Sequence, residues 1–187
     1  MEEEIQKAKK VLKEGGIIVY PTDTIWGIGC DATNLKAVNR IYKLKQRSKQ
    51  KTMIVLLSDR AQIPDYVKDV PEIVWDLLDN YQKPLTIIYN HARNLAKNLI
   101  TENNTIAIRV TNDEFSRRLI EEFGKPIVST SANFSGDNSP LTFNMISPSI
   151  LKNVDYVVEL YHKSMNEVKA STIIKLQKSG DFAIVRP

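Results

Sequence analysis

Residues 17–29 read IIVYPTDTIWGIG, and this stretch decides the fold. Four apolar residues between a glycine pair and a proline predict a short buried strand over 17–20. Pro21 fixes a turn, and hydroxyl, carboxyl and glycine residues follow it directly. Such a cluster at a strand end can grip a small polar ligand, although Thr, Asp and Gly are also ordinary turn residues. The stretch therefore predicts a strand followed by a candidate ligand loop.

Helices and strands alternate along the rest of the chain. Apolar spacing predicts helices over 3–14, 35–45, 71–81 and 113–123, the last capped by Asn112 or Asp113 and ended by Gly124. Short apolar runs predict strands over 53–57, 85–89, 105–110, 127–130, 155–160, 171–176 and 182–186. Residues 134–149 predict a long loop with a helical turn near 144–150. The order lacks a clean βαβ period, so we expect one α/β domain with a mixed sheet, whose ligands lie beyond strand ends.

Composition narrows the class of protein. The chain has 187 residues, 42% hydrophobic and 26% charged, which is typical of one globular domain spanning 1–187. Its apolar runs are too short to span a membrane, so we expect a cytoplasmic protein without membrane contact. Cys30 is the single cysteine and excludes an intramolecular disulfide. His91 and His162 are expected at the surface, and a His/Cys metal site is not expected.

Positive charge gathers in one place. The net charge is +4, but residues 40–51 carry six of the 26 basic residues and no acid, which leaves 20 bases against 22 acids elsewhere. A lysine and an arginine close together suit one compact anion such as a phosphate. A solvated helix face is the alternative interpretation.

Polar groups also follow two other strands. Arg109 ends the apolar run TIAIRV, where a buried charge needs either a ligand or a salt bridge to an acid. Residues 129–136, STSANFSG, offer hydroxyl and amide donors and acceptors, or alternatively cap a helix. Arg186, near the end of the chain, is a candidate ligand or a frayed surface charge.

Taken together, these blocks resemble the YrdC-like family in their order and spacing. The blocks are PTDTIWGIGCDA, IYKLKQR with MIVLL, TIAIRV, STSANFSG, STII and a terminal Val-Arg. The family's paired K-x-R and S-x-N elements stand here as Lys45, Arg47, Ser131 and Asn133. The resemblance runs from about residue 5 to residue 187 and is to the single-domain form. The chain departs from the family at Trp26, where Tyr is usual, and at Ser48, Thr52 and Thr111, where prolines are usual.

The resemblance implies a fold and an activity. The fold is the YrdC/RibB-like α/β fold, a twisted open mixed sheet with surrounding helices and a large concave basic cavity. The activity is that of an L-threonylcarbamoyladenylate synthase, a nucleotidyltransferase that makes threonylcarbamoyl-AMP and pyrophosphate from L-threonine, bicarbonate or CO2, and ATP. A TsaD/Kae-type transferase then uses the product to modify tRNA.

The resemblance also implies roles for individual residues. Lys45 and Arg47 are expected to be catalytic on the phosphates, and Mg²⁺ is expected on the ATP phosphates without protein ligands. Threonine is expected on Thr24, Arg109 and Ser171. The nucleotide is expected on Lys51, Thr105, Ser129, Ser131, Asn133, Ser139 and Arg186. Replacing Lys45 or Arg47 by alanine should cut turnover with little loss of fold.

Two other functions stay open at this point. The same cavity could serve a double-stranded RNA-binding module, which includes direct tRNA binding, although the basic charge is confined to 40–51 and lacks the interleaved aromatics that stack on bases. A YciO-type paralogue with different chemistry is the other alternative. The intact K-x-R and S-x-N pairs favour the synthase.

Overall fold

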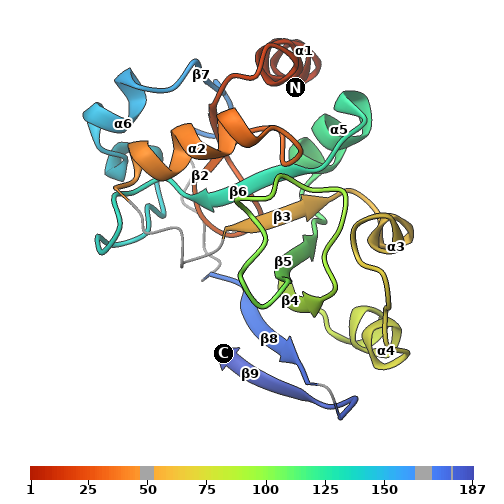
Figure 1. Ribbon diagram of the computed structural model, residues 1–187. Helices are drawn as coiled ribbons and strands as arrows, with labels where there is room; N and C mark the ends of the chain where they lie inside the picture. Colours follow the sequence, from red (N-terminus) through yellow and green to blue (C-terminus); the bar gives the residue numbers. More distant parts are fainter. Residues whose placement is uncertain (47–52, 163–169, 178) are drawn as a thin grey trace.

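A computed structural model describes residues 1–46, 53–162, 170–177 and 179–187 of the chain (Figure 1). Within these residues, nine strands form one sheet in the order β7-β1-β2-β6-β3-β5-β4-β8-β9. Three neighbouring pairs are parallel, β1 with β7, β3 with β5 and β4 with β8, and the others are antiparallel. The sheet is therefore mixed, as the sequence predicts.

The elements match the predicted ones closely. The strands are β1 Ile18–Tyr20, β2 Gly27–Gly29, β3 Ile54–Leu57, β4 Leu85–Asn90, β5 Thr105–Val110, β6 Ile127–Ser131, β7 Tyr156–Val157, β8 Thr172–Leu176 and β9 Phe182–Arg186. The helices are α1 Glu2–Lys13, α2 Leu35–Leu44, α3 Ile63–Tyr66, α4 Ile73–Asn80, α5 Glu114–Phe123 and α6 Pro148–Lys152, with 3-10 turns η1 Arg60–Gln62 and η2 Phe143–Met145. The sequence did not predict β2, η1 or α3, and it predicted a longer β7.

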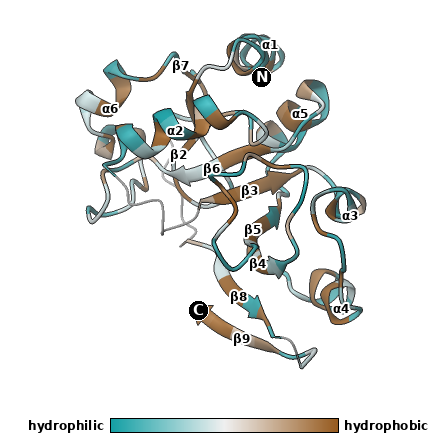
Figure 2. Ribbon diagram, viewed as in Figure 1, coloured by the Kyte–Doolittle hydropathy of each residue, from teal (hydrophilic) through white to brown (hydrophobic). Residues whose placement is uncertain are grey.

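Helices cover both faces of the sheet (Figure 1). On one face α1 and α5 pack together, and Ile18 and Tyr20 of β1 point into the core between them and the sheet. On the other face α2 and α4 cover a larger core that includes Val19 of the same strand. Alternate residues of β1 therefore enter opposite cores, which explains its continuous apolar run. The central strands are correspondingly apolar in Figure 2.

Side-chain caps define where α2 and α5 begin, and a glycine defines where α5 ends. The Asn34 side chain accepts hydrogen bonds from the backbone N–H groups of Lys36 and Ala37, at 3.0 and 3.1 Å, and so starts α2. Asp113 accepts from the Ser116 N–H at 2.7 Å and starts α5. Gly124 ends α5 with φ at 75°, a left-handed conformation that glycine adopts without strain.

Strand β2 falls inside the stretch that the sequence predicts as a loop. Its residues pair with both β1 and β6, and the pairing is close. A Cβ on Gly29 would lie 2.6 Å from the Val128 carbonyl oxygen and 2.7 Å from the Tyr20 ring. Glycine is needed there for packing rather than for a ligand, so the candidate ligand loop shortens to residues 21–26.

No helix in the described part of the chain is long and apolar enough to cross a membrane.

Candidate active site

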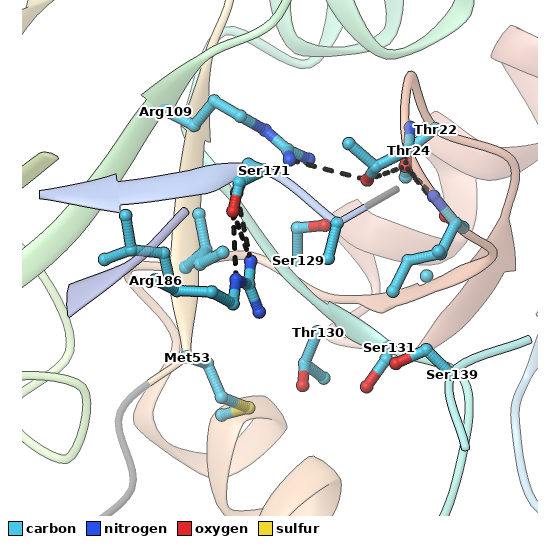
Figure 3. Close-up of a pocket in the computed structure, with 15 residues that line it drawn as sticks. Thr22, Thr24, Met53, Arg109, Ser129, Thr130, Ser131, Ser139, Ser171 and Arg186 are labelled. Atoms are coloured by element: carbon cyan, nitrogen blue, oxygen red, sulfur yellow. Dashed lines mark hydrogen bonds between the residues drawn. The ribbon is translucent and has the colours of Figure 1, made fainter. Parts of the chain in front are cut away.

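A cavity opens where the β1–β2 loop meets the ends of several strands (Figure 3). Hydroxyl groups and two arginines dominate its wall, with a few aliphatic side chains. The described residues that line it are Thr22, Thr24, Ile25, Gly27, Met53, Ile54, Arg109, Ser129, Thr130, Ser131, Ser139, Ala170, Ser171, Ile173 and Arg186. They come from β2, β3, β5, β6, β8 and β9, from the loops at residues 21–26 and 134–142, and from residues 53, 170 and 171, which directly precede β3 and β8. The sheet thus gathers residues from almost the whole length of the chain.

Arg109 brings a buried positive charge to this cavity. Its side chain is 3% exposed, and its Nη2 lies 3.2 Å from Oδ1 of Asp23. Its Nη1 lies 3.4 Å from the Thr24 hydroxyl, and Figure 3 shows the guanidinium turned toward that residue. The Nε of Arg109 is buried, and it has no hydrogen-bond partner among the described residues. A buried guanidinium with an unused donor is a natural partner for a carboxylate or a phosphate.

The β1–β2 loop presents its hydroxyls in a fixed arrangement. The Thr22 hydroxyl donates to the Ile25 carbonyl oxygen at 2.7 Å and accepts from the Thr24 backbone N–H at 3.1 Å. The two threonine hydroxyls lie 3.1 Å apart. These bonds close the loop on itself, so Thr24 is held toward Arg109 before any ligand arrives.

The last strand adds a second arginine. Arg186 donates from Nε and Nη2 to the Ser171 carbonyl oxygen, at 3.0 and 2.7 Å, and its Nη2 also lies 3.3 Å from the Ser171 hydroxyl. Ser171 is itself buried and bonds the Thr86 hydroxyl at 2.8 Å. Partial burial, together with the charge of Arg109, lowers the pKa of Arg186. The two cations therefore share one cavity, which favours an anion between them.

Lys45 reaches the S-x-N segment from the end of α2. Its side chain is 1% exposed, and its ammonium donates to the Ser131 carbonyl oxygen, to the Asn133 carbonyl oxygen at 2.5 Å and to Asn133 Oδ1 at 3.2 Å. The Ser131 hydroxyl in turn bonds Asn133 Oδ1 at 2.5 Å. The structure thus joins the K-x-R and S-x-N elements, but through a buried Lys45. The expectation of little effect on the fold assumed a lysine in an open polar segment, whereas the structure buries Lys45 and its ammonium holds this loop.

The structure brings most of the predicted site residues together. Seven of them line the cavity: Thr24, Arg109, Ser129, Ser131, Ser139, Ser171 and Arg186. Lys45 and Asn133 lie next to it through Ser131. Thr105 lies at the opposite end of β5 from Arg109, where its hydroxyl bonds that of Thr101 at 2.7 Å, and the structure does not bring it to this group. Arg47 and Lys51 fall outside the described residues, and their roles stay predictions.

Several residues of the cavity wall were not predicted from the sequence. Thr22 and Thr130 each stand beside a predicted site residue, in the motifs PTDT and STSAN, so the motifs themselves carried the signal. Met53 and Ile173 carried none, because an apolar residue at a strand end cannot be told from core. His162 is not a plain surface residue. It stacks on Phe143 with ring centroids 3.8 Å apart, whereas His91 is exposed as expected.

The wall of the cavity carries positive charges and hydroxyl groups. The described lining contains no aspartate or glutamate, and no group of three metal-ligating side chains occurs among the residues that the structure describes. This set of donors binds anions through hydrogen bonds and charge. A cation accompanying an anionic ligand would be held by that ligand.

The fold and the cavity define an α/β protein of the YrdC/Sua5 type. The Sua5/YciO/YrdC family model, described as telomere recombination, matches residues 10–187. The chain belongs to this family.

Several relatives carry the name threonylcarbamoyl-AMP synthase. The one from Pseudoalteromonas translucida is 37% identical over 158 residues, covering 83% of this chain and 84% of the relative. The one from Idiomarina loihiensis is 34% identical over 147 residues, covering 77% and 79%.

Solved structures of related proteins share the fold. Sua5 of P. abyssi, in a crystal structure with L-threonine, matches with a TM-score of 0.89 and 25% identity over 100% of this chain. The chain spans 54% of the length of that protein. YciO of E. coli matches with a TM-score of 0.87 and 25% identity, covering 100% of this chain and 89% of YciO. These matches confirm the predicted family and the mixed α/β fold.

Proposed function

We propose that the chain is a threonylcarbamoyl-AMP synthase, which joins L-threonine, bicarbonate or CO2, and ATP into threonylcarbamoyl-AMP and pyrophosphate. One observation carries the proposal: Arg109 and Arg186 face one hydroxyl-lined cavity whose described wall has no acid. ATP and bicarbonate are anions and threonine carries a carboxylate, so a positively charged cavity suits these reactants. The names of the relatives and the threonine-bound Sua5 structure support the same activity.

Threonine fits the part of the cavity around Arg109. Arg109 can pair with its carboxylate, because it lines the cavity and its guanidinium carries a positive charge in a buried place. Thr24 and Ser171 place hydroxyls on either side for the amino and hydroxyl groups of the substrate. The amino group is left to add CO2 and become a carbamate.

The reaction itself needs no protein nucleophile. A carbamate oxygen attacks the α-phosphorus of ATP, the bond to the β-phosphate oxygen breaks, and pyrophosphate leaves. The protein contributes position and positive charge. Ser129, Ser131 and Ser139 can hold the nucleotide along the opposite wall, with Arg186 at the junction of the two substrates. Arg47 is proposed to stabilise the leaving phosphates.

Mg²⁺ fits this site only through the ATP phosphates, because the described wall offers no carboxylate to hold it. When bound there, it would neutralise charge on the phosphate oxygens. Transfer of the product to tRNA by a TsaD/Kae-type partner follows from the proposed activity.

Pyrophosphate release tests the proposal. The assay uses the full chain with ATP and Mg²⁺, with threonine and bicarbonate present or omitted in turn. We expect release only when both are present, and loss of release on chelation of Mg²⁺. Release that ignores threonine would overturn the proposal, and RNA affinity that falls steeply with salt would then favour the RNA-binding function.

A further inference from the structure

Asp23 has no role in the proposed chemistry, yet it is the ionic partner of Arg109. Its Oδ1 lies 3.2 Å from Arg109 Nη2, and its side chain is 15% exposed against 3% for the arginine. Asp23 is absent from the wall of the substrate cavity. It lines a second cavity instead, near the ends of β3 and β5 and the start of β4. Asp23 therefore stands behind Arg109, away from the substrates.

The turn that carries Asp23 is rigid. Thr22 closes the turn with hydrogen bonds to the Thr24 N–H, the Ile25 N–H and the Ile25 carbonyl oxygen, at 3.1, 3.3 and 2.7 Å. The turn is also anchored at both ends, because β1 and β2 pair with each other. Asp23 and its neighbour Thr24 each approach a different terminal nitrogen of Arg109.

These two contacts, one ionic and one a hydrogen bond, favour one orientation of the guanidinium. An arginine has four rotatable bonds, and a carboxylate ligand needs its planar fork at a fixed angle. With Nη2 beside Asp23 and Nη1 beside Thr24, the guanidinium is held in place at the wall of the substrate cavity, which Arg109 lines.

We infer that Asp23 is a positioning residue, which orients the Arg109 guanidinium for the carboxylate of L-threonine without touching the substrate. This inference rests on the proposed function, and Asp23 is then a residue that sets the affinity of the protein for threonine. If Asp23 positions Arg109, removing its charge loosens the guanidinium and weakens threonine binding. If Asp23 only neutralised Arg109, it would compete with the threonine carboxylate, and removing its charge would tighten threonine binding.

The pair also predicts a pH dependence. Burial raises the pKa of the Asp23 carboxyl, the negative charge of Asp113 adds to this, and Arg109 opposes it. Asp23 thus takes up a proton at a higher pH than an ordinary aspartate, and the pair with Arg109 is lost as the pH falls. The charged groups facing Asp23 are Arg109 from β5, Asp113 from the start of α5, and across the second cavity Asp59, Arg60, Asp79 and Lys83.

The test compares Asp23→Asn and Asp23→Glu with wild type. Asp79→Asn is the matched control, because it lines the same second cavity but pairs with Arg60. Threonine affinity is measured by calorimetry without ATP, and kcat and KM by pyrophosphate release from neutral pH downward. We expect Asp23→Asn to raise the threonine Kd and KM roughly tenfold to hundredfold, with kcat at saturating threonine largely kept. Asp23→Glu should recover part of the affinity, and Asp79→Asn should match wild type.

The acid side of the KM profile gives a readout that a purely structural role would not move. In wild type the threonine KM rises as the pH falls, and in Asp23→Asn this rise is absent. Unchanged or tighter threonine binding in a folded Asp23→Asn overturns the inference. A wild type that binds threonine more tightly than Asp23→Asn but releases no pyrophosphate overturns the proposed synthase activity alone. A wild type that binds no threonine overturns both.

Discussion

The Lys45 ammonium donates a hydrogen bond to the Asn133 carbonyl oxygen at 2.5 Å, across 88 residues of sequence. It also donates to the Ser131 carbonyl oxygen and to Asn133 Oδ1, so three oxygen atoms of this loop lie around the ammonium. That loop continues from β6, whose Ser129 and Ser131 form one wall of the cavity. Lys45 therefore shapes the nucleotide side of the site in addition to any contact with phosphate.

Replacing Lys45 by alanine should consequently affect the fold as well as turnover. The substitution leaves two backbone carbonyls and a side-chain amide oxygen without their buried cation. We expect the free energy of unfolding to fall by about 2 kcal/mol and the KM for ATP to rise. Thermal melts and pyrophosphate release measure the two effects. Lys43→Ala is the control, since Lys43 is exposed on the same helix. A Lys45→Ala protein with an unchanged melting temperature would contradict the buried clamp.

Removing Arg109 should lower the free energy of unfolding, because it leaves the buried carboxylate of Asp23 without its ionic partner. In Arg109→Met, Asp23 keeps a carboxylate in a largely buried place without its cation, and we expect a loss of about 3 kcal/mol in the free energy of unfolding. The double variant Arg109→Met with Asp23→Asn should recover much of this loss, because the unpaired charge is gone. Denaturant unfolding of the four proteins of this cycle measures the coupling. Purely additive losses would show that the two side chains do not interact.

The sequence predicted the strands and helices well because their apolar spacing is local. Helix α5 spans Glu114–Phe123, between the caps Asp113 and Gly124 that the sequence indicates. Strand β2 was missed because Gly27 and Gly29 look like turn residues, and only the nearness of Tyr20 and Val128 shows that glycine is needed for packing. This nearness is a property of the tertiary structure and cannot be inferred from the local sequence.

The residues of the site likewise fall into those that local motifs predict and those that only the tertiary structure identifies. Ordered motifs predicted Thr24, Arg109 and Ser171, and the structure places them on one cavity. The partners of Arg109 and Lys45 could not be predicted, since Asp23 lies 86 positions away from Arg109 and Ser131 lies 86 positions away from Lys45. The apolar run around Arg109 predicted that this cation needs a partner, but many acids were available, and nothing in the sequence predicted that Lys45 would be buried.

We expect nucleotide binding to depend on Arg186, which lies at the end of the last strand, β9. Its side chain holds the Ser171 carbonyl oxygen and lines the cavity beside Arg109. We expect Arg186→Ala to raise the KM for ATP roughly tenfold at low salt, with a smaller ratio at high salt because Arg186 is exposed and its charge is screened. The exposed Lys175 on β8 provides the control Lys175→Ala. Equal ATP affinity in Arg186→Ala and wild type would place the terminal strand outside the nucleotide site.

Glu4 should make the stability of the α1 face depend on acid. Although burial acts to raise the pKa of its carboxyl, hydrogen bonds from the Tyr156 hydroxyl at 2.6 Å, the Glu159 N–H at 2.7 Å and Lys7 hold it below the usual 4.5. A carboxyl whose folded pKa is lowered stabilises the protein above its unfolded pKa, and that stability is lost as the pH falls through the lowered value.

Glu4→Gln should therefore lower the free energy of unfolding at neutral pH by about 1–2 kcal/mol, since bonds to a charged carboxylate are replaced by weaker ones. The difference from wild type should shrink as the pH falls from the usual 4.5, where Glu4 of the unfolded chain takes up a proton, through the lowered pKa of the folded protein. Denaturant unfolding across this range measures it, with Glu3→Gln as control because the Glu3 side chain is 80% exposed. A stability difference that stays constant down to the lowest pH would mean that the ionised carboxylate contributes nothing, and that Glu4 ties α1 to the segment after β7 through its shape alone.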